Sequence, residues 1–200
     1  MDQKTIDAYN HLAGKYDEET SDFWKKFPRT FLDEFIKLVD DTVLDVGSGP
    51  GRDAVILRDH GLHVTCIDAS RAMIEMSRAK GLASVLGNFE SLPFDDGSFG
   101  GVWAYTSLLH VPKNEIEKPL REIRRVLKPD GVFGLGLIEG TMEEYRQTEK
   151  VPEDRWFSFY TREEVENLLA QYGFEIVYFE QFKPKTKNYL NFISKKIGCS

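Results

Sequence analysis

Short runs of β-branched and other apolar residues alternate with stretches of helical spacing from about residue 42 onward. We interpret the apolar runs as strands at residues 43–46, 63–67, 84–86, 99–105 and 132–138. Helical stretches follow the first two strands, at about residues 51–60 and 70–80. This alternation predicts a parallel sheet with helices on both faces and right-handed crossovers.

The segment after the fourth predicted strand carries a helical face that a proline interrupts. Its apolar residues recur at helical spacing: Ile116, Leu120, Ile123 and Leu127. Proline fits the first turn of a helix but not its interior. We therefore expect the regular helix to begin near Pro119, after an irregular turn that Asn114 opens.

A later helix is marked at both ends. Thr161 and Glu164 form a T-x-x-E capping box, and Gly173 is a stop signal. Two β-rich runs follow, at 175–182 and 189–193. The loop between them is too short for a helical crossover, so these strands should pair antiparallel. The predicted fold class is α/β: a doubly wound, mostly parallel sheet with a final antiparallel hairpin.

The first 40 residues have a helical pattern. Leu32, Phe35, Ile36 and Val39 share a face that should pack on the sheet, and Tyr9, Leu12 and Tyr16 form a second stripe. This segment either closes an edge of the core or covers a ligand as a lid. We therefore divide one compact domain into a helical cap, residues 1–40, and a main body, residues 41–200.

Composition narrows the possible classes of protein. A hydrophobic fraction of 41% in 200 residues excludes a disordered or collagen-like chain. The formal charge of −7, without a basic stripe, argues against a nucleic-acid partner. Cys66 and Cys199 make no disulfide framework. Neither a signal peptide nor a membrane-length apolar run is evident, so we expect a cytoplasmic protein without a membrane partner.

A glycine-rich loop follows the first predicted strand and opens a helix. Gly47, Gly49 and Gly51 allow a tight turn and close approach of a ligand. We expect a side chain at Gly47 to occupy the ligand's volume while leaving the fold largely intact. Asp68, 21 residues after Gly47, ends the second strand, where a carboxylate can accept two ribose hydroxyls. A ribose-bearing cofactor is therefore expected.

Three details of the loop decide between cofactors. The dinucleotide pattern G-x-G-x-x-G needs a glycine where this chain has Arg52. Pro50 removes a backbone N–H from a pyrophosphate cradle. Asp45 places a carboxylate before the loop, which repels pyrophosphate and suits a cation. S-adenosylmethionine carries an ammonium and a sulfonium and has no phosphate, so it fits better than NAD.

The chain resembles the class I S-adenosylmethionine-dependent methyltransferases of the small-molecule type. The resemblance is carried by V-L-D-V-G-S-G-P-G-R-D-A at 43–54 and I-D-A-S at 67–70, with further motifs at 87–94, 99–112 and 127–132. Residues 9–17 resemble the N-terminal cap of such enzymes. The resemblance implies a Rossmann-like fold and S-adenosylmethionine as cofactor.

The resemblance also implies roles for individual residues. Asp45, Gly47 and Gly49 would surround the methionine end, and Asp68 would accept the ribose hydroxyls. The adenine would be lined by Ala69, Met73, Asn88 and Phe89, although Met73 could equally be a core residue. Tyr105 or Thr106 would lie under the methionine. Asn88 stands where the family often has aspartate, and its side-chain oxygen can still accept a hydrogen bond.

Methyl transfer is an in-line displacement at carbon, for which alignment and exclusion of water matter most. His110 follows the fourth strand and is the best candidate for a catalytic base or substrate orienter, unless it bonds only the local backbone. No metal-ligand spacing is present. Arg29 and Arg155 could clamp an acidic acceptor, although lone arginines are usually solvated.

We expect a closed, partly aromatic acceptor pocket with His110 at its rim and the N-terminal segment as lid. Tyr9, Tyr16 and Trp156 would line it, and the acceptor would be a small molecule. Trp156 could also fill the gap between the sheet and its last helix. Two alternatives to this enzyme are a module that binds the cofactor without transfer and an NAD-dependent oxidoreductase.

Overall fold

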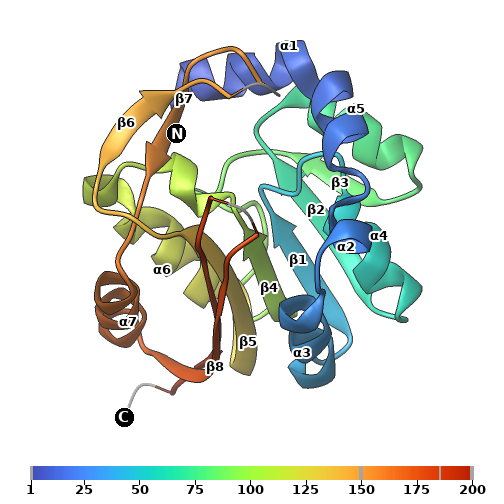
Figure 1. Ribbon diagram of the computed structural model, residues 1–200. Coiled ribbons are helices and arrows are strands. Elements are labelled where there is room, and N and C mark those ends of the chain that lie inside the picture. The colour runs from blue at the N-terminus through green and yellow to red at the C-terminus, as the bar shows by residue number, and fades with distance from the viewer. Residues whose placement is uncertain (1, 149–150, 185, 199–200) are drawn as a thin grey trace.

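The computed structural model describes residues 2–148, 151–184 and 186–198. A seven-stranded sheet forms its centre, in the order β3-β2-β1-β4-β5-β9-β8 (Figure 1). The strands are β1 (Thr42–Val46), β2 (His63–Asp68), β3 (Ala83–Leu86), β4 (Phe99–Tyr105), β5 (Leu127–Ile138), β8 (Phe174–Phe182) and β9 (Tyr189–Lys196). The first five are parallel, and β9 pairs antiparallel with both β5 and β8. The predicted doubly wound sheet with a final antiparallel pair is confirmed.

Seven α-helices occur in the described residues. They are α1 (Gln3–Thr20), α2 (Phe23–Lys26), α3 (Thr30–Leu38), α4 (Arg52–Asp59), α5 (Arg71–Ala79), α6 (Glu117–Val126) and α7 (Arg162–Gln171). A 3₁₀ turn at Lys113–Glu115 precedes α6, as expected around Asn114, and Pro119 sits in the first turn of the helix. The capping box of Thr161 and Glu164 is formed.

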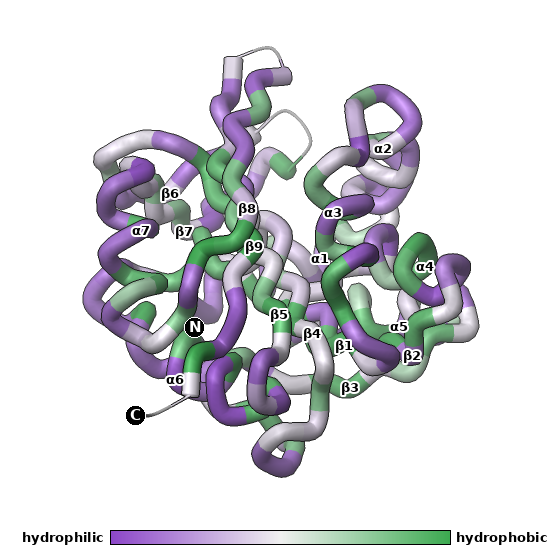
Figure 2. The backbone as a smooth tube through the Cα atoms, turned by 90° about the horizontal axis from the view of Figure 1, so that it is seen from below, coloured by the Kyte–Doolittle hydropathy of each residue, from purple (hydrophilic) through white to green (hydrophobic). Residues whose placement is uncertain are grey.

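The sheet is buried on both faces because its strands alternate their side chains. Val43 and Trp103 face the cluster that includes α3 and α4, whereas Leu44 and Val102 face the cluster that includes α6 and α7. A Cβ at Gly134 in β5 would lie 2.5 Å from the Trp103 ring, so this glycine makes room for the indole. Figure 2 shows hydrophobic strands at the centre and hydrophilic stretches of helix outside them.

The first 40 residues divide into two parts. Helix α3 belongs to the core, because the rings of Phe31 and Phe35 lie 4.6 and 4.9 Å from that of Trp103. Helix α1 instead lies across the carboxyl edge of the sheet, at the top of Figure 1. Its Asn10 side chain accepts a hydrogen bond from the Ser70 hydroxyl at 2.8 Å, which ties it to α5.

A small antiparallel hairpin, β6 (Glu143–Arg146) and β7 (Arg155–Ser158), lies beside α1 (Figure 1). The sequence analysis predicted no strand here. The Trp156 backbone N–H donates to Thr5 Oγ1 at 2.9 Å, so the hairpin is fixed to the start of α1. Cys66 is buried and unpaired, and Cys199 lies outside the described residues. In the described ranges, no helix is long and apolar enough to span a membrane.

Candidate active site

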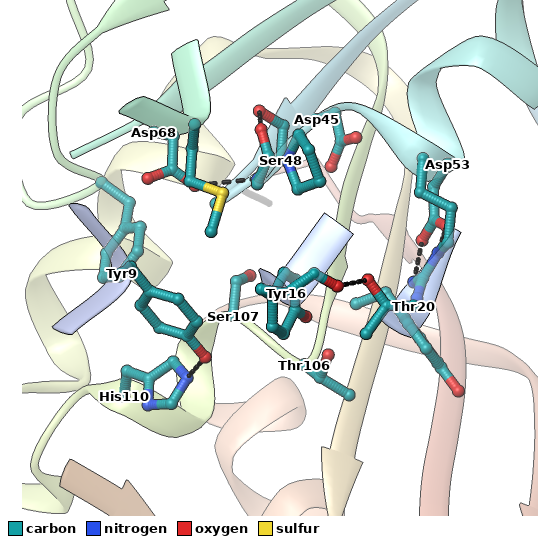
Figure 3. Close-up of a pocket in the computed structure, with 17 residues that line it drawn as sticks. Tyr9, Tyr16, Thr20, Asp45, Ser48, Asp53, Asp68, Thr106, Ser107 and His110 are labelled. Atoms are coloured by element: carbon teal, nitrogen blue, oxygen red, sulfur yellow. Dashed lines mark hydrogen bonds and ion pairs between the residues drawn. The ribbon is translucent and has the colours of Figure 1, made fainter. Parts of the chain in front are cut away.

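Two adjoining cavities open at the carboxyl edge of the sheet. The first, the loop cavity, is built on the β1–α4 loop and contains residues 47–50 together with Asp45, Asp68, Met73 and Phe89 (Figure 3). The second, the outer cavity, has a volume of about 560 Å³ and extends under the hairpin and the β8–β9 loop. Both are lined by Tyr9, Tyr16, Thr20, Arg52, Tyr105, Thr106 and His110, so the cavities meet at these side chains.

The loop cavity lies where the strand order reverses between β1 and β4, the usual ligand position in open α/β sheets. Gly49 has a φ of +54° and donates its N–H to Asp68 Oδ2 at 2.8 Å. The Ser70 N–H donates to Asp68 Oδ1, also at 2.8 Å. Burial nevertheless raises the pKa of Asp68, against the effect of these donors. The loop and this carboxylate are therefore held as one unit.

The two loop glycines differ in what a side chain would meet. A Cβ at Gly47 would lie 2.3 Å from Ser107 Cβ, and the φ of +67° is unfavourable for other residues. The expectation that a side chain at Gly47 leaves the fold intact is therefore wrong. At Gly49 the nearest atom is Tyr16 Cε1 at 4.0 Å, within the cavity. Gly49 is thus where the backbone is open to a ligand.

Asp45 lies in β1 directly below the loop and is 3% exposed. Its Oδ2 has no hydrogen-bond partner in the described residues. Burial, reinforced by the nearby Asp53 carboxylate and opposed by Arg52, raises the pKa of Asp45 well above its usual value. A buried carboxylate oxygen that lacks a donor is suited to a cationic hydrogen-bond donor.

Arg52 lines both cavities on the α4 side, whereas Asp53 lines only the loop cavity. Asp53 accepts from Arg52 Nε at 2.6 Å, Trp24 Nε1 at 2.7 Å and Trp103 Nε1 at 2.9 Å. Burial alone would raise the pKa of Asp53, but these donors hold it below its usual value. The Arg52 guanidinium lies 4.9 Å from the Phe23 ring, which fixes α2 against the site. The sequence analysis treated Arg52 only as the absent third glycine.

A chain of hydrogen bonds runs along the junction of the cavities. His110 Nδ1 lies 2.6 Å from the Trp156 carbonyl oxygen, which can only accept, so Nδ1 carries the proton. His110 Nε2 therefore accepts from the Tyr9 hydroxyl at 2.8 Å (Figure 3). That hydroxyl accepts in turn from Arg155 Nη1 at 3.0 Å. Burial lowers the pKa of His110 to about 3, so the ring is neutral near pH 7.

Several expected site residues do not line either cavity. Asn88 is exposed, and its Oδ1 accepts from the Glu90 N–H at 2.9 Å. Ala69 is likewise absent from both linings. Trp156 was expected in the acceptor pocket, but its indole instead donates to Ser158 Oγ at 3.0 Å. Because side chains alternate along β7, Arg155 and Phe157 face the outer cavity and Trp156 does not.

A sequence family described as "Methyltransferase domain" matches residues 44–135. The chain is 30% identical over 193 residues to a malonyl-[acyl-carrier protein] O-methyltransferase of Geobacter sulfurreducens, a match that covers 88% of this chain and 71% of that protein. The chain belongs to the class I S-adenosylmethionine-dependent methyltransferases. S-adenosylmethionine is the cofactor of that family.

Further relatives match a smaller part of this methyltransferase or match it at lower identity. The chain is 39% identical over 98 residues to a glycine/sarcosine/dimethylglycine N-methyltransferase of Actinopolyspora halophila, a match that covers 44% of this chain and 17% of that protein. The chain spans 62% and 26% of two other curated relatives. The crystal structure of Burkholderia thailandensis 1,6-didemethyltoxoflavin-N1-methyltransferase superposes with a TM-score of 0.70 at 20% identity, over 96% of this chain and 88% of that one. At this identity the likeness concerns the fold.

The loop cavity of this methyltransferase fits its family's cofactor. The unpartnered Asp45 Oδ2 offers an acceptor to an ammonium group, and Gly49 leaves space beside the backbone. Arg29 is not among the lining residues of either cavity, and its Nε donates to Asp33 at 2.8 Å. Thr20, Ser48 and Ser107 also line the loop cavity, and the sequence analysis gave them no role, although Ser48 and Ser107 lie within the motifs at 43–54 and 99–112.

Proposed function

We propose that this methyltransferase transfers a methyl group from S-adenosylmethionine to a small-molecule acceptor by in-line displacement. The observation that supports it is the pair of cavities that meet at Tyr9 and His110. One contains the glycine loop and three carboxylates, those of Asp45, Asp53 and Asp68, which suits a cation with a ribose. The other adjoins it, contains no carboxylate of a described residue, and has space for an acceptor.

In this proposal Asp68 accepts the ribose hydroxyls, Asp45 faces the ammonium, and Gly47 and Gly49 line the methionine end. Met73 and Phe89, both buried and both lining the loop cavity, take the adenine. Ala69 and Asn88 would join them at the adenine edge only through their backbone or a change of rotamer. S-adenosylmethionine supplies a methyl group on a sulfonium, which is already an activated leaving group.

The role we propose for His110 is positioning and not proton abstraction. Both ring nitrogens are engaged, one by the Trp156 carbonyl and the other by the Tyr9 hydroxyl. A pKa of about 3 makes the ring a weak base near neutral pH. His110 therefore orients Tyr9 at the junction, and Tyr105 forms the floor beside it. Alignment and exclusion of water then supply the rate enhancement.

We also propose that helix α1, the first part of the expected cap at residues 1–40, acts as the lid. Tyr9 and Tyr16 of α1 line both cavities, and their rings lie 5.4 Å apart at an angle of 83°. A helix across the site leaves little room for a folded macromolecule. This supports a small acceptor, and the glycine acceptor named for the Actinopolyspora enzyme is consistent with it.

The test has two parts: calorimetry with S-adenosylmethionine and with NAD, and detection of S-adenosylhomocysteine after incubation with a metabolite extract. We expect S-adenosylmethionine to bind, NAD not to bind, and S-adenosylhomocysteine to form. Asp68→Ala should weaken binding, whereas Asp59→Ala, an exposed carboxylate on α4, should not. Binding without turnover would identify a cofactor-binding module, and NAD binding an oxidoreductase.

A further inference from the structure

Arg155 is a buried cation without a carboxylate partner among the residues that the structure describes. The residue is 4% exposed and faces the outer cavity from β7. Its Nη1 donates to the Tyr9 hydroxyl at 3.0 Å and its Nη2 to Thr148 Oγ1 at 2.9 Å. Its Nε is buried and has no acceptor in the part of the chain that the structure describes. The guanidinium is held between the rings of Tyr9 and Phe157, each 5.2 Å away.

Burying an arginine in this position costs folding free energy unless an anion pairs with its charge. Guanidinium stays protonated at every ordinary pH, so Arg155 cannot become neutral on burial. Both of its partners in the described residues are uncharged hydroxyls, and three of its five N–H donors have no acceptor there. Arg52, the other arginine that lines the outer cavity, is partly buried and is paired with Asp53 instead. The contrast between Arg52 and Arg155 indicates that the Arg155 guanidinium pairs with an anionic group of a ligand.

The two cavities also differ in the charge of the side chains that line them. No aspartate or glutamate of the described residues lines the outer cavity, whereas Arg52, Arg155 and Lys187 do. The remaining surface is largely aromatic or aliphatic and includes Phe23, Phe27, Phe157 and Tyr189. A volume of about 560 Å³ falls within the usual range for small-molecule sites, ~300–1,000 Å³. An anion with an apolar body matches this lining.

We propose that Arg155 binds a carboxylate of the methyl acceptor, which is therefore a small acid with an aromatic or aliphatic body. This inference rests on the proposed function, because it identifies the outer cavity as the acceptor site. The planar guanidinium can offer the Nε–H and an Nη–H side by side, a geometry that suits a carboxylate. Arg155 donates a hydrogen bond to Tyr9, which lines both cavities. An acid bound to Arg155 would therefore lie close to the junction of the cavities.

The experiment compares matched acid and amide probes. Calorimetry would measure binding of phenylacetate and phenylacetamide, and of octanoate and octanamide, to the protein saturated with S-adenosylhomocysteine. We expect at least one acid to bind tenfold or more tightly than its amide, which corresponds to about 1.4 kcal/mol. Arg155→Gln should abolish this preference, and Arg155→Lys should retain part of it.

Arg146→Gln is the matched control. Arg146 lies opposite Arg155 in the β6–β7 register, but it is half exposed and forms an ion pair with Glu144. This variant should keep the preference for the acid. Thermal melting of each variant would establish that it is folded.

Three results would overturn the proposal: equal affinity of acid and amide for the wild type, no binding by any acid, or a preference that survives Arg155→Gln. Loss of S-adenosylhomocysteine affinity in Arg155→Gln would overturn it as well, because Arg155 would then serve the cofactor's own carboxylate. The probes are also titrated without S-adenosylhomocysteine. If the protein binds neither form of the cofactor, the proposed function fails, while the acid preference still tests Arg155.

Discussion

Asp45→Asn separates the charge of the buried carboxylate from its shape. The substitution keeps the size of the side chain and removes its ability to ionise. In the wild type, Asp45 Oδ2 has no donor among the described residues, and burial raises the pKa of Asp45 well above its usual value. We expect the Asp45 carboxylate to bind the ammonium group of S-adenosylmethionine in its ionised form.

The magnitude follows from the value of a charged hydrogen bond. Hydrogen bonds to charged groups contribute ~1.5–3 kcal/mol, so the variant should bind S-adenosylmethionine about ten- to a hundredfold more weakly. At a pH below its folded-state pKa, the wild-type carboxyl must lose its proton when S-adenosylmethionine binds. Affinity for S-adenosylmethionine should therefore rise with pH until the folded-state pKa of Asp45 is passed, and the variant should lack this dependence. Arg52, Asp53 and Asp68 are the charged neighbours that set the pKa of this carboxyl.

The pH dependence of stability has the opposite sign to that of S-adenosylmethionine affinity. Because the pKa of Asp45 is higher in the folded state than its unfolded value of about 3.9, the folded state binds the proton more tightly. The wild type therefore loses this contribution to stability as pH rises from the unfolded towards the folded pKa. Asp45→Asn has no such loss. The free energy of unfolding of the variant minus that of the wild type should therefore increase as pH rises.

Calorimetry in two buffers with different ionisation enthalpies checks the first expectation, since proton release makes the measured heat depend on the buffer. Urea unfolding at several pH values checks the second. Asp59→Asn, at an exposed position on α4, serves as control. An unchanged affinity and pH profile in a folded Asp45→Asn protein would refute the assignment of Asp45 to the ammonium.

Three further predictions concern neighbouring groups. Gly49→Ala, at φ +54°, should cost ~1–2 kcal/mol of stability in urea unfolding and should also weaken S-adenosylmethionine binding in calorimetry. Gly61→Ala, at φ +90° with nothing within 4 Å of the added Cβ, is the control and should show only the loss of stability. Tyr9→Phe should lower the free energy of unfolding by ~1–3 kcal/mol, because Arg155 Nη1 and His110 Nε2 both lose their hydrogen bond to the Tyr9 hydroxyl. Asp68→Ala should lose ~1–3 kcal/mol of S-adenosylmethionine affinity in titration calorimetry, and an unchanged affinity would contradict the ribose role.

Most of the sheet could be predicted because its strands are short apolar runs between helices. The fourth strand matches its predicted bounds, 99–105. The fifth starts at Leu127 and not at residue 132, because Leu127 pairs with Phe99 ahead of the turn residue Asp130, whose φ is +59°. Lys-Pro-Asp-Gly in this segment has the composition of a turn, which concealed the earlier pairing.

The β6–β7 hairpin could not be recognised from its sequence. Residues 156–160 contain four aromatics around one serine, so no apolar–polar alternation is visible. The partner strand, Glu143–Arg146, is mostly charged and therefore unlike a buried strand. Without the hairpin, the two-residue period of this strand was unknown. Trp156 was therefore assigned to the pocket and Phe157 was not, while Arg155 was named only as a possible clamp for an acidic acceptor.

The loop cavity was largely predictable because it follows from one continuous motif. Asp45, Gly47 and Gly49 lie within five residues, and strand pairing brings Asp68 to the same edge. The contacts at the junction were not predictable in the same way. Tyr9 and His110 are 101 residues apart, and Tyr9 and Arg155 are 146 apart. Only the placement of α1 across the sheet edge brings these groups together.

The junction also explains why the acceptor side depends on elements outside the sheet. A two-stranded hairpin such as β6–β7 is marginally stable alone, so its position rests on its contacts. Thr5 accepts from the Trp156 N–H, the His110 ring donates to the Trp156 carbonyl, and Ser158 Oγ donates to the Val111 carbonyl at 2.7 Å. Helix α1 and the β4 loop therefore hold the strand that presents Arg155. If α1 is the lid and Arg155 binds the acid as we propose, movement of α1 would displace both the cover of the loop cavity and the arginine, and would couple cofactor binding to recognition of the acid.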